Sequence, residues 1–284
     1  MARNLLVYFV IDNSGSMNLT DTNGIKRIDG ALSVLDGLKR AIEDSSLASL
    51  KTLIKPAVIS FNQVPTLVFP NDPNNIKDNR HMRKFTENLI DIKKTIKNNC
   101  TNNQTFYTAL FNYLGQLIKE DQKAMIRDNV DYYRPLICFI TDGKPEGNTE
   151  TNEAIMCSFD TLFTTNLGHE NENEVKSPVI YCVGIGNGEE NEYKNLKKYG
   201  AGRLATDGDK KIISNYRKNN GDLVKIVQRN YTQEFNYLSD NIVNSIILSF
   251  SPTTNDSQNN RNEWDIAETF DSTISPMTPN QSVL

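Results

Sequence analysis

The sequence predicts an α/β protein with a doubly wound, mostly parallel sheet and helices on both faces. Apolar runs alternate along the chain with segments in which apolar residues recur at helical spacing. Uninterrupted apolar runs are typical of strands that are buried on both faces, as in parallel sheets. The chain has 284 residues, of which 38% are hydrophobic, so it is long enough to bury a sizeable core.

The strands of this sheet are predicted from the apolar runs. The run at residues 5–11 is followed at once by Asp12, and the run at 135–143 also contains an aspartate near its end, Asp142. Residues 66–69 are expected to form a hairpin with the strand that precedes them. The strands are predicted at residues 5–11, 54–61, 66–69, 135–143 and 178–186, with weaker candidates at 202–211 and 222–228.

Helices are predicted between these strands from the 3–4-residue spacing of apolar side chains. In the first helix, for example, Ile28, Leu32, Leu35 and Ile42 share one face. Residues 63–82, 121–134 and 206–230 are interpreted as long loops. The helices are predicted at residues 27–44, around 85–96, around 106–117, at 150–165, at 189–198 and at 235–249.

Charge and composition divide the chain into a domain over residues 1–250 and a tail over residues 251–284. The tail is rich in Asn, Ser, Thr and Pro, and its five acids and one arginine account for the whole net charge of −4. It is predicted to be disordered, and its segment "EWDIAETF" is either a random cluster or a short motif that folds on a partner. The body is neutral, which argues against binding to nucleic acid or to anionic lipid.

The remaining composition argues for a cytoplasmic protein with no membrane segment. Residues 5–11 follow Arg3, as in a signal peptide, but the run is short and no small-residue cleavage pattern follows it. No segment is long enough to cross a membrane. The four cysteines form no C-x-x-C pair and are interpreted as buried thiols, and the two histidines lie in polar sequence surroundings.

Oxygen-bearing side chains follow the first predicted strand at alternate positions. Asp12, Ser14 and Ser16 form a D-x-S-x-S pattern, and Asp142 ends the later strand in "FITDG". The carboxyl ends of parallel strands meet at one edge of a sheet, so Asp12 and Asp142 are expected to lie close together. Carboxylates and hydroxyls are hard ligands suited to Mg²⁺, Mn²⁺ or Ca²⁺ rather than to zinc. If no metal binds, Asp12 and Ser14 would merely cap a helix.

The stretches "VIDNSGSM" and "FITDGKP" resemble the von Willebrand factor A (VWA) domain and its metal-ion-dependent adhesion site (MIDAS). The resemblance implies that Asp12, Ser14, Ser16 and Asp142 bind a divalent cation, with Mg²⁺ expected and Mn²⁺ or Ca²⁺ as alternatives. It further implies a threonine ligand from a loop before a helix, which matches "NNQTFYTAL" imperfectly. Thr105 is the preferred residue, and an ungapped match would place Gln104 in that position; Thr101 and Thr108 are less favoured alternatives.

The resemblance also implies a function. In this family, an Asp or Glu of a partner protein completes the coordination of the metal. The opening "YFVIDNSGSM" and the closing "FNYLSDNIVNSI" look most like small bacterial VWA proteins associated with tellurite resistance. Such proteins tend to be encoded beside kinase-like and phosphatase-like proteins, which are therefore expected as partners.

An enzyme is not expected, because the residues that catalysis requires are missing. The D-x-D of haloacid dehalogenase-type phosphatases has Ser14 in its third position, and neither a P-loop nor a G-x-S-x-G elbow is present. With two histidines, a general base is hard to nominate. Two alternatives remain open: a VWA scaffold that binds through its loops or tail with a vestigial metal site, and a metal-dependent phosphohydrolase.

Overall fold

A computed structural model describes residues 3–20, 23–43, 51–70, 80–101, 103–132, 135–142, 145–164, 178–185 and 224–227. Within these residues the centre is a six-stranded sheet in the order β3-β2-β1-β4-β5-β6. Neighbouring strands pair in parallel except for β2 and β3, which form an antiparallel hairpin. The strands are β1 (Leu5–Asp12), β2 (Ile54–Phe61), β3 (Thr66–Phe69), β4 (Leu136–Thr141), β5 (Val179–Ile185) and β6 (Val224–Val227).

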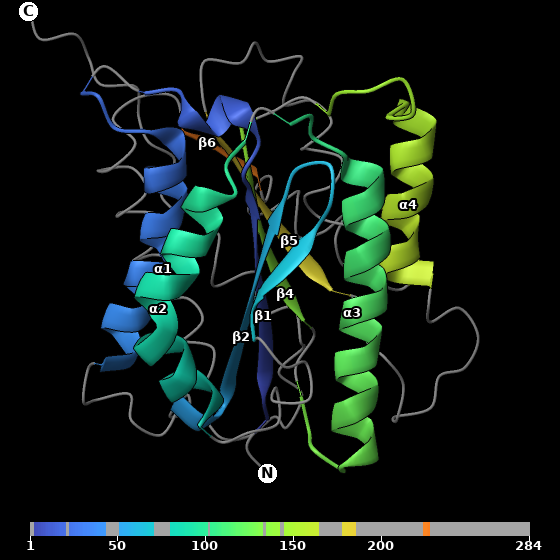
Figure 1. The fold of residues 1–284 in the computed structure, drawn as a ribbon. Helices are drawn as coiled ribbons and strands as arrows, with labels where there is room; N and C mark the ends of the chain where they lie inside the picture. Colours follow the sequence, from blue (N-terminus) through green and yellow to red (C-terminus); the bar gives the residue numbers. More distant parts are fainter. Residues whose placement is uncertain are drawn as a thin grey trace, which may run out of the picture.

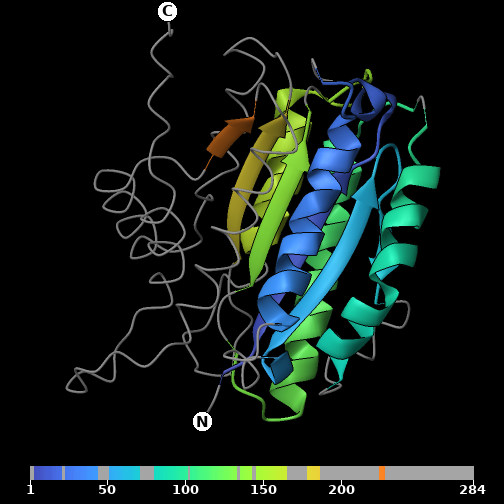
Figure 2. The ribbon, with the colours of Figure 1, turned by 90° about the vertical axis from the view of Figure 1, so that its left-hand side faces the viewer.

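Helices cover both faces of the sheet, as predicted. Helices α1 and α2 lie on one face, and α3 and α4 lie on the other (Figure 1). The view turned by 90° shows α1 lying in front of the sheet, roughly along the direction of the strands (Figure 2). None of the described helices is both long enough and apolar enough to cross a membrane. The helices are α1 (Arg27–Glu43), α2 (His81–Asn98), α3 (Tyr107–Arg127), α4 (Asn152–Thr164) and the short 3-10 helix η1 (Gly15–Asn18).

The core forms around β1 and β2, in which every residue is buried. The predicted helical faces pack against these strands: Leu32 and Leu35 of α1 are fully buried, as are Phe85 and Ile96 of α2. Burying one such side chain contributes roughly 1.5–3 kcal/mol, so the apolar stripes hold the helices on the sheet.

Strand β1 marks a reversal in the order of the sheet. The next strand along the chain, β2, pairs with one side of β1, and β4 pairs with its other side. In open α/β sheets, ligands bind beyond the carboxyl ends of the strands at such a switch point. Asp12 is the last residue of β1 and Asp142 follows β4, so both lie at this point.

Two local expectations were wrong. The loop expected at residues 121–134 is helical up to Arg127, because Gln122 and Met125 continue the buried face of α3 while Lys123 and Arg127 lie on its outer side. The cysteines were expected to be buried thiols, but Cys157 is exposed and Cys100 is only half-buried, whereas Cys138 and Cys182 are buried. His81, although its sequence neighbours are polar, is fully buried, and its ring nitrogen lies 2.6 Å from the carbonyl oxygen of Pro56. The helices predicted at 189–198 and 235–249, the strand at 202–211 and the tail at 251–284 lie outside the described residues.

Candidate metal centre

The D-x-S-x-S turn folds back onto its own aspartate. Asp12 is fully buried at the end of β1, and the backbone N–H of Ser14 donates a 2.8 Å hydrogen bond to Asp12 Oδ1. Ser14 is buried, whereas Ser16 in η1 is exposed. Asp12 and Ser14 are therefore withdrawn from solvent, and the cluster is open to solvent on the side of Ser16.

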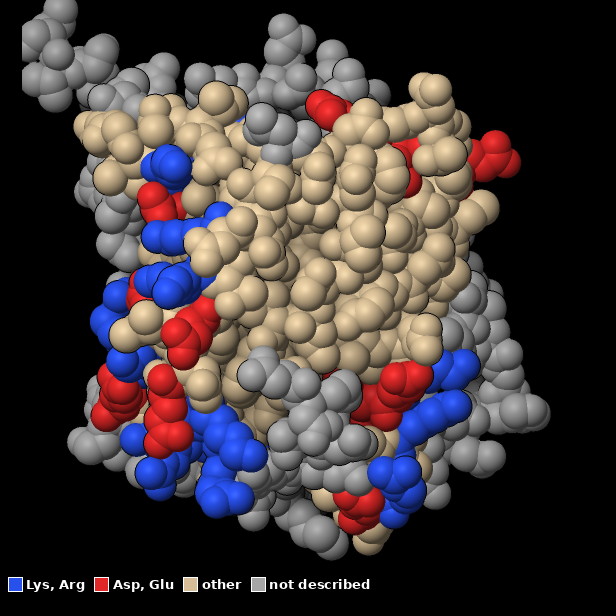
Figure 3. All heavy atoms as spheres, viewed as in Figure 1, with Lys and Arg blue, Asp and Glu red and all other residues tan. Residues whose placement is uncertain are grey.

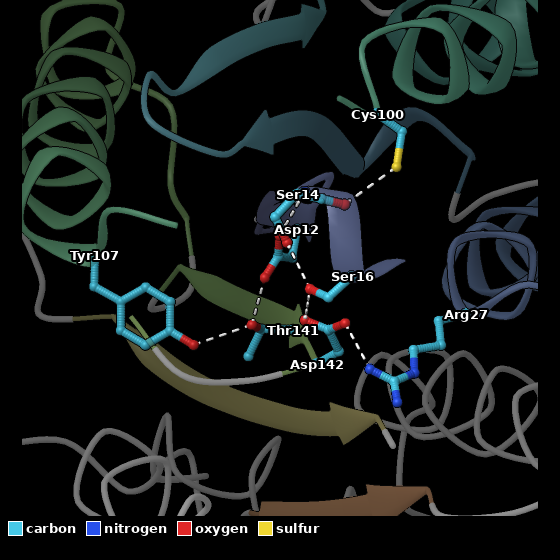
Figure 4. A network of polar contacts seen from close by, with 8 residues as sticks. All are labelled: Asp12, Ser14, Ser16, Arg27, Cys100, Tyr107, Thr141 and Asp142. Carbon is cyan, nitrogen blue, oxygen red and sulfur yellow. Dashed lines mark hydrogen bonds and ion pairs between the residues drawn. The ribbon is translucent and has the colours of Figure 1, made fainter. Parts of the chain in front are cut away.

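Two serines connect this turn to the aspartate that follows β4. The hydroxyl oxygens of Ser14 and Ser16 lie 3.1 Å apart, and Ser16 Oγ donates to Asp142 Oδ1 at 2.9 Å. Strand β4 runs parallel to β1 with Ile140 opposite Ile11, which brings the ends of the two strands together. Four of the five predicted ligands thus form one hydrogen-bonded cluster (Figure 4).

Two residues that sequence reasoning missed complete the inner side of the cluster. Thr141 Oγ1 donates to Asp12 Oδ2 at 2.7 Å, and the hydroxyl of Tyr107 lies 3.0 Å from Thr141 Oγ1. Because the single hydroxyl proton of Thr141 is used on Asp12, Tyr107 is the donor in the second bond. The position of Thr141, directly before Asp142 on a strand next to β1, was the available signal.

A third missed residue, Arg27, lies on the outer side of the cluster. Its Nη1 donates to Asp142 Oδ2 at 2.8 Å in an ion pair (Figure 4). Arg27 is the first residue of α1, and no motif in the sequence connects it with Asp142, which is 115 positions away. Cys100 lies beside the turn, where its Sγ donates to the carbonyl oxygen of Ser14 at 3.3 Å.

Burial and a neighbouring negative charge make the Asp12 carboxyl group difficult to ionise. Burial, followed by the charge of Asp142, raises the pKa of Asp12 to about 7, while hydrogen bonds from Thr141 and Ser14 act in the opposite direction. A cation bound beside Asp12 would stabilise this buried carboxylate as an anion. The pKa of Cys100 is raised to about 11, mainly by burial and by the Asp12 charge.

The structure does not join the Thr105 side chain to the cluster. Among the described residues, the hydrogen bonds that connect the other four predicted ligands do not reach the Thr105 hydroxyl. Thr105 is buried and Gln104 is exposed. The carbonyl oxygen of Thr105 accepts from Glu146 N at 3.0 Å, which ties this segment to the chain that follows Asp142.

Glu150 adds a second connection between the chain that follows Asp142 and the start of α3. Its Oε2 accepts hydrogen bonds from the backbone N–H groups of Tyr107 at 2.7 Å and Thr108 at 3.0 Å. A carboxylate at a helix N-terminus satisfies unpaired N–H groups and interacts favourably with the helix dipole. The segment that carries Thr105 and the chain after Asp142 are therefore held to each other.

The chemistry of the cluster fits a hard divalent cation. It offers the carboxylates of Asp12 and Asp142 and the hydroxyls of Ser14 and Ser16, with no sulfur or imidazole among them. Within the described part of the chain, no group of three or more His, Cys, Asp or Glu side chains is placed to hold a metal. A site with two acids therefore depends on its hydroxyl oxygens and on water for the remaining ligands.

Solved structures with a similar fold extend this description. One is a von Willebrand factor type A protein from Catenulispora acidiphila, which is 14% identical to this chain. The match covers 84% of this chain and 42% of that protein's chain, with a TM-score of 0.50. Proximal thread matrix protein 1 from the mussel byssus (14% identity, coverage 88% and 48%, TM-score 0.44) is also similar. So is the PilB minor pilin from Streptococcus sanguinis (11% identity, coverage 88% and 63%, TM-score 0.48).

The chain spans less than two thirds of the length of each of these structures. No family model and no curated protein matches it. At such low identity the comparison concerns the fold alone. The strand order, the parallel pairing and the similarity to the Catenulispora protein together show that this chain has the α/β fold of a von Willebrand factor A domain.

Proposed function

We propose that the chain is a protein-interaction module that binds its partner through a divalent cation. The cation is Mg²⁺, with Mn²⁺ or Ca²⁺ as alternatives, and a bound cation would offer an open coordination position to an Asp or Glu carboxylate of the partner. The observation that carries the proposal is the convergence of four predicted ligands at the switch point of the sheet. The ligands proposed are Asp12, Ser14, Ser16, Thr105 and Asp142.

The chain's own residues have distinct parts in this proposal. Thr141 and the Ser14 N–H orient the Asp12 carboxylate, and Tyr107 in turn orients Thr141. The fixed orientation reduces the entropy that is lost when a ligand binds. Ser16 is exposed, so the partner's carboxylate would approach from its side.

The biological setting is proposed from the sequence resemblance alone. We propose a non-enzymatic role in the bacterial cytoplasm, in a stress or tellurite-resistance system with kinase-like or phosphatase-like partners. The missing catalytic motifs support the absence of an enzymatic activity.

A second candidate function is a VWA scaffold with a vestigial metal site. Two observations favour it: the Thr105 side chain is not joined to the cluster, and a guanidinium already neutralises Asp142. Such a scaffold would bind its partners through loops or the tail and would be indifferent to chelators. The two candidates therefore differ in whether binding requires metal.

The first experiment measures the affinity of the purified chain for the cation alone. Mn²⁺ binding is followed by electron paramagnetic resonance and Mg²⁺ binding by calorimetry, in the wild type and in Asp12→Asn and Ser16→Ala. The matched control is Ser33→Ala on α1, where the hydroxyl bonds only the carbonyl of Gly30 at 2.7 Å. We expect one site that is lost in Asp12→Asn, weakened in Ser16→Ala and unchanged in Ser33→Ala. Equal binding by all four proteins would exclude this cluster.

The same titration identifies the loop ligand. Thr105→Ala should weaken metal binding, whereas Gln104→Ala should not, because Gln104 is exposed while Thr105 is buried next to the chain that follows Asp142. A loss confined to Gln104→Ala would show that the ungapped sequence match was right. Capture of partners from cell extract in Mg²⁺ and in EDTA then distinguishes the metal-dependent module from the scaffold.

A further inference from the structure

We infer that Arg27 sets the charge of the metal centre so that it selects an anionic partner. The guanidinium weakens the binding of the cation and strengthens the binding of a carboxylate to the cation-loaded centre. This inference rests on the proposed function, and it adds to it a residue that determines specificity.

Arg27 is held in place by the loop that continues from the D-x-S-x-S turn. The backbone N–H of Arg27 donates to the carbonyl oxygen of Leu19 at 3.0 Å, and Thr20 pairs with Lys26 in an antiparallel bridge. The chain thus leaves the cluster after η1 and returns to it at the start of α1. This return brings the guanidinium to Asp142 although the two residues belong to different elements.

The ion pair is partly shielded from water. The side chains of Arg27 and Asp142 are 14% and 4% exposed, and Arg27 Nη1 lies 2.8 Å from Asp142 Oδ2. The other carboxylate oxygen of Asp142 accepts from Ser16. Charges in such surroundings interact more strongly than exposed charges and are screened less by salt. The positive charge of Arg27 therefore contributes to the electrostatics of the whole cluster.

Counting formal charges gives the direction of the two effects. With both aspartates ionised, the cluster and Arg27 together carry −1, and adding a divalent cation gives +1. Without Arg27 the corresponding charges are −2 and 0. A cation is attracted more strongly to the site that carries −2, so it binds there with higher affinity. An incoming carboxylate is attracted more strongly to the cation-loaded site that carries +1.

The opposite signs distinguish this role from a structural one. If Arg27 only held α1 and β4 together, its loss would loosen the cluster and weaken both binding steps. If Arg27 sets the charge, its loss improves the first step and impairs the second. The ligand class follows from the same count: a centre that carries +1 favours a carboxylate over a neutral amide.

The test compares the full chain with three variants at Arg27 and its neighbour. Arg27→Gln removes the charge and Arg27→Lys keeps it. Lys26→Gln removes an adjacent exposed charge whose Nζ lies 3.3 Å from Asn18 Oδ1 rather than on Asp142. Mn²⁺ affinity is measured by electron paramagnetic resonance. Acetate is then titrated into the Mn²⁺-loaded proteins, and its binding is followed by the relaxation rate of water protons, with acetamide as the neutral probe.

We expect Arg27→Gln to bind Mn²⁺ about tenfold more tightly and acetate about tenfold more weakly than the wild type. Arg27→Lys and Lys26→Gln should stay near wild-type values, and acetamide should not respond to any variant. Weaker or unchanged Mn²⁺ binding by Arg27→Gln, with normal binding by the wild type, would overturn the role of Arg27. Absence of Mn²⁺ binding by the wild type would instead overturn the proposed function.

Discussion

Replacing Asp121 with asparagine should make the protein's stability less dependent on pH. Asp121 lies on α3 with 4% of its surface exposed, and the hydroxyl of Tyr8 on β1 donates to its Oδ2 at 2.7 Å. Burial raises the pKa of Asp121 to about 7, the Tyr8 hydrogen bond lowers it, and the charge of Glu120 raises it. An asparagine keeps the acceptor oxygen for Tyr8 and is always neutral.

The size of the effect follows from the difference in pKa between the folded and unfolded chains. Unfolded Asp121 ionises near pH 4, whereas folded Asp121 remains protonated up to about pH 7. Raising the pH from 4 to 7 therefore favours the unfolded wild type by about 1.4 kcal/mol per pH unit, with an upper limit of about 4 kcal/mol. Below pH 4 and above pH 7 the contribution is constant.

The assay is urea unfolding of both proteins in EDTA at several pH values from 4 to 8. The free energy of unfolding of Asp121→Asn minus that of the wild type should rise with pH up to about 7 and then level off. Other groups, including Asp12, titrate in both proteins and cancel in the difference. The control is Asp91→Asn, an exposed acid on α2 that is not among the groups acting on Asp121, and it should give a flat difference. A flat difference for Asp121→Asn as well would refute the reasoning.

The remaining predictions concern the cap of α3 and the cysteines. Glu150→Ala should lower the free energy of unfolding by about 1 kcal/mol and weaken Mn²⁺ binding, because two N–H groups of α3 lose their acceptor. Denaturant titration and electron paramagnetic resonance test this, and Asp91→Ala, an exposed acid in the middle of α2, should change neither. Iodoacetamide should modify the exposed Cys157 in the native protein, while Cys138 and Cys182 react only on unfolding because burial raises their pKa values. The extent of alkylation of each cysteine is measured by mass spectrometry of peptides. Equal labelling of Cys157, Cys138 and Cys182 in the native protein would contradict the burial of the last two.

The parts of the fold that sequence analysis predicted are those governed by periodicity. Helix α1 and strand β2 agree with the prediction to within a residue, because each presents an uninterrupted apolar pattern. The extension of α3 to Arg127 was missed because its last turns are mostly polar, and two of the three residues on their buried face, Asp121 and Gln122, are polar themselves. Polar residues on the outer side of a helix resemble a loop when they are considered alone.

The candidate site was predicted only as far as its motifs extend. Asp12 and Asp142 were placed together because the parallel strand ends they follow share an edge of the sheet. Arg27 could not be predicted, since its contact depends on the path of the loop between η1 and α1. Thr141 was adjacent to a predicted ligand, but its bond to Asp12 depends on the register between β1 and β4.

The sheet order also determines when the site can assemble during synthesis. Strand β1 is made first, yet Thr141, which orients Asp12, is separated from it by 129 positions. A ribosome that adds roughly 5–20 residues per second needs about 6–25 seconds to bridge this interval. During that time β1 can pair with β2 but not with β4, so its second edge is open to wrong partners. Assembly of the cluster on the nascent chain therefore has to wait for β4, and destabilising β4 should lower the yield of folded protein more than the metal affinity of the protein that does fold.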